Sequence, residues 1–349
     1  MKIRVKSFGE LPSGEQVSLF VLENGNGMSA EISTFGGALT RLIVPGRNDT
    51  VDDVVLGYDA LEQYITNKGY LGVIVGRNAN RIAGAEFTLG ETLWKLCKND
   101  GGNNLHGGPF GLSFRLFSAK THIYEDSASL SLFCEIPHNS DDFPGNLVVT
   151  IVYTLTSGNS LKISYHAVSD ADTVINLTHH AYFNLAGHAG GDIYPQTIQI
   201  NADYFCPGRA DCLTTGEILS VLGSPFDLRS PRAFGGCLMS DCEQLRQFGG
   251  FDHNFVLRGK DYRLAATVSD PASERVMDVF TDMPGIQLYT ANNLESGLYK
   301  DNAVYAKHHA FCLETQYFPN AVNMPWLVSP LFRAGEEFVS ATEYKFRIN

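Results

Sequence analysis

The sequence predicts an all-β fold, a large antiparallel β-sandwich with few short helices. Apolar residues recur with a period of two in successive segments, and no regular alternation with helical patterns interrupts them. Aromatic residues make up 11% of the 349 residues and there are 34 glycines, as expected of many strands joined by turns. No repeat or linker divides the chain, so we expect one domain over residues 1–349.

The expected elements follow in chain order. A short helix is predicted at 59–66, an apolar strand at 71–75, and a hairpin of 87–89 with 93–96 around Gly90-Glu91-Thr92. Strict alternation then predicts half-buried strands at 129–136, 147–155 and 161–168, the last two joined by the turn 157–160. A second short helix is predicted at 242–248. Further apolar strands begin near Asp252 and Gln287.

The composition excludes several classes of partner. The formal net charge is −12 and no basic run is present, so neither a nucleic acid nor a membrane surface is an expected partner. The first residues lack the apolar region of a signal peptide, and no stretch approaches the roughly 20 apolar residues of a membrane helix. Seven cysteines, an odd number without zinc-site spacing, fit reduced thiols. We therefore expect a cytoplasmic protein without a metal ion, either a monomer or a homodimer.

One carboxylate, Glu314, stands inside the apolar and aromatic run 311–318. A buried carboxylate must be paired, hydrogen-bonded or shifted in pKa, because an isolated buried charge is costly. Prolines and asparagines follow, which places Glu314 near a strand end. Carboxylates in such surroundings serve general acid–base catalysis, so Glu314 is the first candidate catalytic residue.

Two adjacent histidines, His179 and His180, point to opposite faces if they lie on a strand. His180 then shares its face with Tyr182 and Asn184, which forms a polar and aromatic stripe. Histidine is the usual proton-transfer group near neutral pH. A core histidine with satisfied hydrogen bonds explains the same pattern equally well.

Further polar groups stand at strand ends and in glycine-containing loops. The candidates are Asn80 and Arg81 in 76–81, His106 in 103–108, Asp252 and Gln287. Each one alone fits an ordinary turn or a solvated strand end. Together, planar polar groups beside aromatic rings suit a sugar. The motifs of phosphate-binding loops, serine hydrolases and zinc proteases are absent.

These segments, taken in order, resemble the aldose 1-epimerase (galactose mutarotase) family. The matching motifs are GRNANRI at 76–82, NLHGG at 104–108, FPGNL at 143–147, NLTHHAYFNL at 176–185, GFDHNFVL at 250–257, PGIQLYT at 284–290 and CLETQYFPNAVN at 312–323. They span nearly the whole chain. The resemblance implies the large galactose mutarotase-like β-sandwich and an isomerase that needs no cofactor.

The resemblance also implies roles for the matching residues. Glu314 would be the general base and His180 the general acid that open and close the ring of a free aldose such as D-galactose or D-glucose. Glu314 would then start ionised and His180 protonated, with Arg81 helping to keep the carboxylate ionised. The expected sugar-binding residues are Asn80, Arg81, His106, Tyr182, Asp252 and Gln287.

The chain departs from the family pattern at several positions. His179 stands where the family usually has Asn, and Asn320 stands where an Asp is common. The run 110–115 lacks the usual Trp, and 208–212 replaces an acidic turn. These departures leave the proposed chemical pair intact and the preferred sugar open.

Two other functions fit the same residues. Glu314 and Asp252 could be the two carboxylates of a glycoside hydrolase. Alternatively, the chain could bind a sugar without turning it over.

Overall fold

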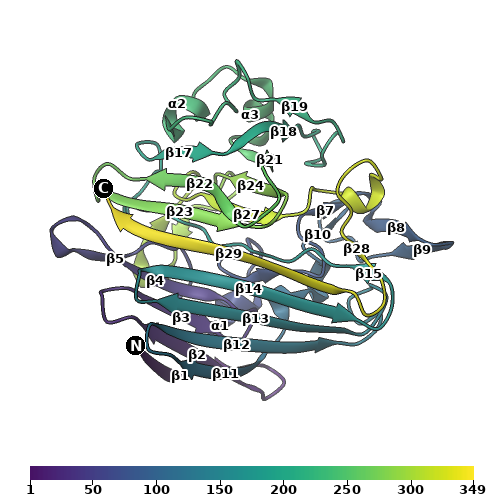
Figure 1. Cartoon of the computed structure of the whole chain (residues 1–349), viewed down its shortest axis with the longest axis horizontal. Helices are drawn as coiled ribbons and strands as arrows, with labels where there is room; N and C mark the ends of the chain where they lie inside the picture. The colour runs from purple at the N-terminus through teal and green to yellow at the C-terminus, as the bar shows by residue number, and fades with distance from the viewer.

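The computed structural model describes all residues, 1–349, and is nearly all β, as predicted. A nine-stranded antiparallel sheet spans the molecule (Figure 1). In spatial order its strands are β11 (Ser118–Ile123), β12 (Ser127–Ile136), β13 (Leu147–Thr156), β14 (Ser160–Ser169), β29 (Glu337–Ile348), β23 (Arg275–Thr281), β22 (Arg263–Ser269), β17 (Thr197–Ile200) and β20 (Arg232–Ala233).

Two five-stranded sheets accompany it. The first consists of consecutive strands, β1 (Lys2–Glu10), β2 (Gln16–Glu23), β3 (Ser29–Ser33), β4 (Leu39–Pro45) and β5 (Val51–Asp53). The second has the spatial order β19 (Leu219–Ser220), β18 (Ala202–Cys206), β21 (Asp252–Leu257), β24 (Gly285–Tyr289) and β27 (Cys312–Gln316).

Five short two-stranded ladders and a few helical turns complete the elements. The ladders pair β6 (Ile74–Val75) with β16 (Thr178–His179), β7 (Arg81–Ile82) with β10 (Asn104–Leu105), β8 (Glu86–Leu89) with β9 (Thr92–Lys95), β15 (Thr173–Val174) with β28 (Leu331–Phe332), and β25 (Gly297–Leu298) with β26 (Val304–Tyr305). The α-helices are α1 (Leu61–Ile65), α2 (Phe234–Leu238) and α3 (Glu243–Phe248). Short 3₁₀ turns lie at Arg47–Asp49, Ala83–Ala85, Gly108–Phe110, Leu112–Phe114, Lys300–Asn302 and Ala321–Asn323.

Both predicted helices and the predicted hairpins are present. Helix α2 was not predicted, because it has five residues and two of them are the poor helix formers Gly235 and Gly236. The structure contains no helix long and apolar enough to cross a membrane.

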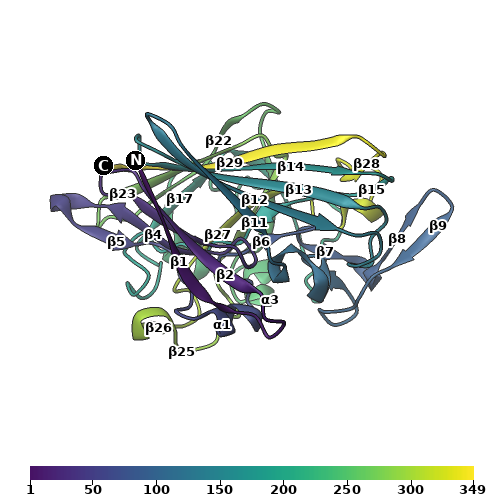
Figure 2. The same cartoon turned by 90° about the horizontal axis from the view of Figure 1, so that it is seen from below.

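The core lies between the nine-stranded sheet and the smaller sheets. Along β13 every second residue is buried, from Leu147 to Leu155, as the period of two predicts. Figure 2 shows the nine-stranded sheet as one layer, with β27 and β6 beneath it. Between the layers lies a cluster of 59 buried hydrophobic residues that extends in sequence from Phe20 to Phe346. This packing of sheet on sheet confirms the predicted β-sandwich.

A buried ion pair anchors the loop that leads from β6 to β7. Arg77 donates from Nε and Nη2 to both carboxylate oxygens of Asp141, each at 3.0 Å, and both side chains are completely buried. Burial lowers the pKa of Arg77 and raises the pKa of Asp141, while each charge opposes that shift in the other. Arg77 is thus a structural residue of this loop, and Asn80 and Arg81 follow it directly.

Replacing one partner of this pair should unfold the protein more easily. Asp141→Ala leaves the Arg77 guanidinium buried without its counter-charge, and we expect it to lower the free energy of unfolding by about 3–5 kcal/mol. Urea denaturation measures this change. The exposed Asp261→Ala is the control and should change the free energy by less than about 0.5 kcal/mol. A loss below about 1 kcal/mol in Asp141→Ala would contradict the prediction, since it would equal an ordinary surface contact.

His179 and His180 point to opposite faces, as expected. His179 is buried on the core side, its ring lies edge-on to Tyr153 at 5.9 Å, and neither ring nitrogen has a hydrogen-bond partner. Burial lowers the pKa of His179 to about 3, with a smaller contribution from His180. The imidazole is therefore held neutral in the folded protein.

This neutral histidine should make the protein less stable in acid. Between pH of about 6.5 and 3 the unfolded chain binds a proton at His179 that the folded chain does not, so stability falls as the pH falls. His179→Asn removes this titration and should lose less stability than the wild type between pH 7 and pH of about 4. Urea denaturation at both pH values measures the difference, and the exposed His122→Asn is the control. If His179→Asn and the wild type lose the same amount of stability between the two pH values, His179 does not contribute to the acid sensitivity.

Candidate active site

A cavity of about 410 Å³ opens on the face of β27 that is turned away from the nine-stranded sheet. Its volume is in the range of small-molecule sites. The predicted residues that line it are Asn80, Arg81, His106, His180, Tyr182, Asp252 and Glu314. Gln287 is the exception, since it is buried and does not line the cavity.

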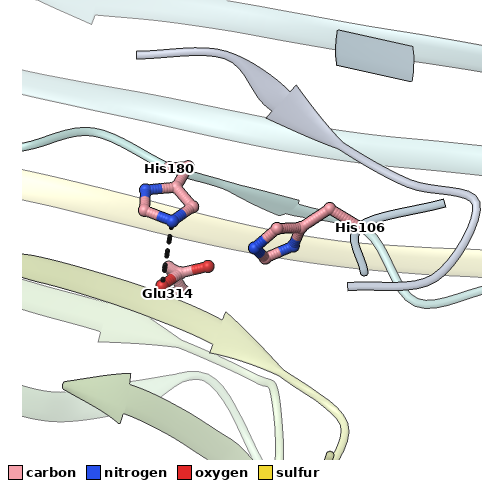
Figure 3. A group of neighbouring side chains, drawn as sticks. All are labelled: His106, His180 and Glu314. Carbon is pink, nitrogen blue, oxygen red and sulfur yellow. Dashed lines mark ion pairs between the residues drawn. The ribbon is translucent and has the colours of Figure 1, made fainter. Parts of the chain in front are cut away.

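His180 and Glu314 face one another inside this cavity. His180 Nε2 lies 3.6 Å from Glu314 Oε1, and both side chains are buried (Figure 3). Glu314 is the middle residue of the five-residue strand β27, which ends two residues later at Gln316, so Glu314 lies near a strand end as predicted. It reaches the segment that carries His180, because β27 is the last strand of its sheet and that segment lies beside it.

The burial of this pair determines its protonation. Burial raises the pKa of Glu314 well above its usual value, Asp252 raises it further, and Arg81 lowers it. Burial lowers the pKa of His180 to about 4. The interior therefore opposes the ionised carboxylate and protonated imidazole that the sequence led us to expect. The neutral pair (protonated Glu314, neutral His180) and the ion pair (ionised Glu314, protonated His180) contain the same single titratable proton. The two side chains therefore act as two alternative sites for that proton.

His106 is held by a reciprocal contact with Asn80. Leu105 pairs with Arg81 across the β7–β10 ladder. The residue next to each of them in the sequence has a left-handed backbone conformation, with φ of 57° at His106 and 63° at Asn80. The His106 N–H donates to Asn80 O at 3.1 Å, and the Asn80 N–H donates to His106 Nδ1 at 3.2 Å. Burial lowers the pKa of His106 well below its usual value, so the ring is neutral. With Nδ1 accepting, Nε2 carries the proton and is a hydrogen-bond donor.

His106, His180 and Glu314 lie close enough to suggest a metal centre. Candidate ligand atoms of the three residues lie within 4.8 Å of one another. A neutral imidazole has one lone pair, however, and that of His106 already accepts the Asn80 N–H. A metal ion would have to break this contact. The arrangement fits hydrogen bonding and proton transfer better than metal coordination.

Charged groups also line the cavity, namely Arg81, Asp100 and Asp252. Arg81 Nε donates to Asp100 Oδ2 at 2.7 Å. Gln287 Nε2 donates to Asp252 Oδ1 at 2.7 Å, so Gln287 helps to hold the Asp252 carboxylate in place. Burial raises the pKa of Asp252, and the positive charge of Arg81 lowers it.

Aromatic rings surround His180. The Tyr182 ring is stacked on the imidazole at 5.0 Å and 17°, and its hydroxyl donates to Gly69 O at 2.7 Å. Tyr182 thus supports the His180 ring as well as lining the cavity. Sequence reasoning missed Tyr70, whose ring lies 4.7 Å from that of His106. Its position directly before the strand predicted at 71–75 was the only signal in the sequence.

The chain matches a family model and curated proteins along nearly its whole length. The model for aldose 1-epimerase matches residues 18–345. The chain is 41% identical to the galactose mutarotase of Bos taurus, over 98% of this chain and 97% of that one. It is 39% identical to the human galactose mutarotase, with the same coverage of both chains. It is 33% identical to the aldose 1-epimerase of Haemophilus influenzae, over 96% of this chain and 97% of that one.

Solved structures show the same architecture. The galactose 1-epimerase of Lactobacillus acidophilus is 26% identical and has a TM-score of 0.88, with 100% of this chain and 99% of that one covered. An aldose epimerase homologue from Caenorhabditis elegans is also 26% identical, with a TM-score of 0.87 over 95% of this chain and 99% of that one. On these matches, the chain belongs to the aldose 1-epimerase family.

Proposed function

We propose that this protein is an isomerase that interconverts the α- and β-anomers of free aldoses such as D-galactose and D-glucose. The observation that carries the proposal is the buried pair of His180 Nε2 and Glu314 Oε1, 3.6 Å apart, at the wall of a cavity of about 410 Å³. Anomer interconversion needs one group that accepts a proton and one that donates it. Membership of the aldose 1-epimerase family supports the same reaction.

Ring opening needs two proton transfers. Glu314 takes the proton of the C1 hydroxyl, and His180 gives a proton to the ring oxygen. The bond between C1 and the ring oxygen breaks and leaves an aldehyde. Rotation about C1–C2 exposes the other face of the carbonyl group. The ring then closes with the two proton transfers reversed, which returns both groups to their starting states.

The burial of the pair suits this proton transfer. Opening the ring converts ionised Glu314 and protonated His180 into their neutral forms. Burial favours the neutral pair, while the positive charge of Arg81 favours the ionised carboxylate. These opposing effects bring the two states closer in energy, and matched proton affinities assist general acid–base catalysis.

The remaining groups around the cavity would bind the hydroxyls and the apolar face of the sugar. We propose hydrogen bonds from Asn80, Arg81 and His106 Nε2–H, and an accepting role for Asp252. Gln287, which does not line the cavity, would position Asp252 rather than contact the sugar. We further propose that the chain acts as one domain in the cytoplasm.

Glu314→Gln should remove catalysis and leave sugar binding nearly intact. The amide keeps the shape of the side chain but cannot accept the C1 proton, so we expect kcat to fall by about 10²–10⁴. Polarimetry of α-D-galactose or α-D-glucose measures the rate, and calorimetry measures binding. Glu91→Gln, an exposed change in the turn between β8 and β9, is the control and should keep the wild-type rate.

The same assays distinguish the alternatives. A Glu314→Gln variant with the wild-type rate would contradict the assignment of the base. Release of reducing sugar from a glycoside would indicate a hydrolase that uses Glu314 and Asp252. Sugar binding by the wild type without faster mutarotation would indicate a non-catalytic binding protein.

A further inference from the structure

Unpartnered polar atoms gather behind the cavity, next to Glu314. The buried residues that carry them are Thr178, Asn254, Gln287, Glu314 and Gln316. None of these residues is more than 4% exposed. In Glu314 the unpartnered atom is Oε2, while Oε1 faces His180. Buried polar atoms in proteins are nearly always hydrogen-bonded, so this cluster requires an explanation.

The cross-strand register brings four of these residues onto one face of the sheet. Gln287 lies opposite both Asn254 and Glu314. Gln316 is two residues beyond Glu314 on β27 and therefore points to the same side. These side chains extend the row of polar groups from the cavity wall into the interior.

Thr178 approaches the same row from the neighbouring segment. That segment runs antiparallel to β27 and is joined to it by the bridge between Phe183 and Phe311. Counting along both segments from this bridge places His180 opposite Glu314 and, two residues further along each segment, Thr178 opposite Gln316. Thr178 and Gln316 thus form a second polar pair, deeper than the first and on the same face.

Gly285 provides space for this group. A Cβ at Gly285, which pairs with Gln316, would lie 2.6 Å from Asn254 Oδ1 and 3.0 Å from the ring of Phe318. The absence of a side chain lets the Asn254 amide lie against β24. Phe318, which is 5% exposed, also lies close to Gly285.

The unpartnered atoms cannot satisfy one another. The oxygens of Asn254, Gln287, Glu314 and Gln316 all need donors, and among the unpartnered atoms of these five residues only the Thr178 hydroxyl and the Gln316 amide can donate. Water supplies two donors per molecule and typically makes about three hydrogen bonds in such buried polar sites. A group of acceptors with few donors is therefore the kind of site that holds buried water.

We infer that ordered water molecules bridge these atoms and donate to Glu314 Oε2, with Thr178 and Gln316 acting as positioning residues for the carboxylate. This inference rests on the proposed function, in which Glu314 is the base. The donated hydrogen bonds hold Oε1 toward His180. They also stabilise the ionised carboxylate against the effect of burial.

Other charged and titratable groups also face Glu314, and they remain in place in the variants below. They are His180 and Tyr182 after β16, His106 after β10, Arg81 on β7, Asp252 on β21, Tyr289 on β24 and Cys312 on β27 itself. On the core side, Tyr344 of β29 donates to the carbonyl of Leu313.

The pH dependence of mutarotation tests this role. Thr178→Val keeps the side-chain shape but removes the hydroxyl, and Gln316→Met removes the amide. Losing donors to the ionised carboxylate raises the pKa of Glu314. We therefore expect the limb of the kcat/KM profile that Glu314 governs to move to higher pH by about one unit, with KM within about threefold of the wild type. Thr178→Ser, which restores a hydroxyl, should restore the wild-type profile.

A matched control lies on the same strand. Thr315 points to the other face of β27, where its hydroxyl bonds that of Thr342. Thr315→Val should lower the melting temperature without moving the acidic or the basic limb of the kcat/KM profile. If both limbs also stay in place in folded Thr178→Val and Gln316→Met, the positioning role is wrong.

A crystal structure of the wild type provides a readout that does not depend on activity. We expect water within hydrogen-bond distance of Glu314 Oε2, Thr178 Oγ1 and Gln316, and we expect the water nearest residue 178 to be lost in Thr178→Val. A direct bond from a side chain to Oε2, without water at Thr178 and Gln316, would overturn the inference. If the wild type does not accelerate mutarotation, the proposed function fails, and the crystal structure still decides whether the water is present.

Discussion

The site depends on the burial of an acid and a base against one another. Glu314 and His180 lie on adjacent segments, and neither is exposed enough to keep the solvation of a charged side chain. Desolvation raises the pKa of the carboxyl and lowers that of the imidazole, so both shifts favour neutral forms. The positive charge of Arg81 opposes this shift at Glu314. The rest of the fold has to hold these three groups in a fixed arrangement.

Three separate parts of the sandwich provide that arrangement. β27 carries Glu314 at the edge of its sheet, with its neighbouring side chains packed on the nine-stranded sheet. The stacked Tyr182 ring orients His180. The β7–β10 ladder supplies Arg81, and the Arg77–Asp141 pair anchors the loop that precedes it. Each part is rigid for its own reason, whether by sheet pairing, aromatic packing or a buried ion pair.

Much of the fold could be predicted because its signals are local. The alternation of apolar residues in β12, β13 and β14 follows directly from the two faces of a sheet. Turn residues such as Gly90 and Glu91 mark a hairpin for equally local reasons. Helix α2 was missed because its five residues have no helical pattern.

By itself the sequence determined the fold class, the family motifs and the residue types that carry the chemistry. These depend on side-chain chemistry and short-range periodicity, which can be read along the chain. Only the tertiary structure decided that His180 lies opposite Glu314, that Gln287 donates to Asp252, and that His179 belongs to the core. It also decided the direction of the pKa shifts. Strand pairing between distant segments determines both contact and burial, and no local pattern in the sequence specifies which segments will pair.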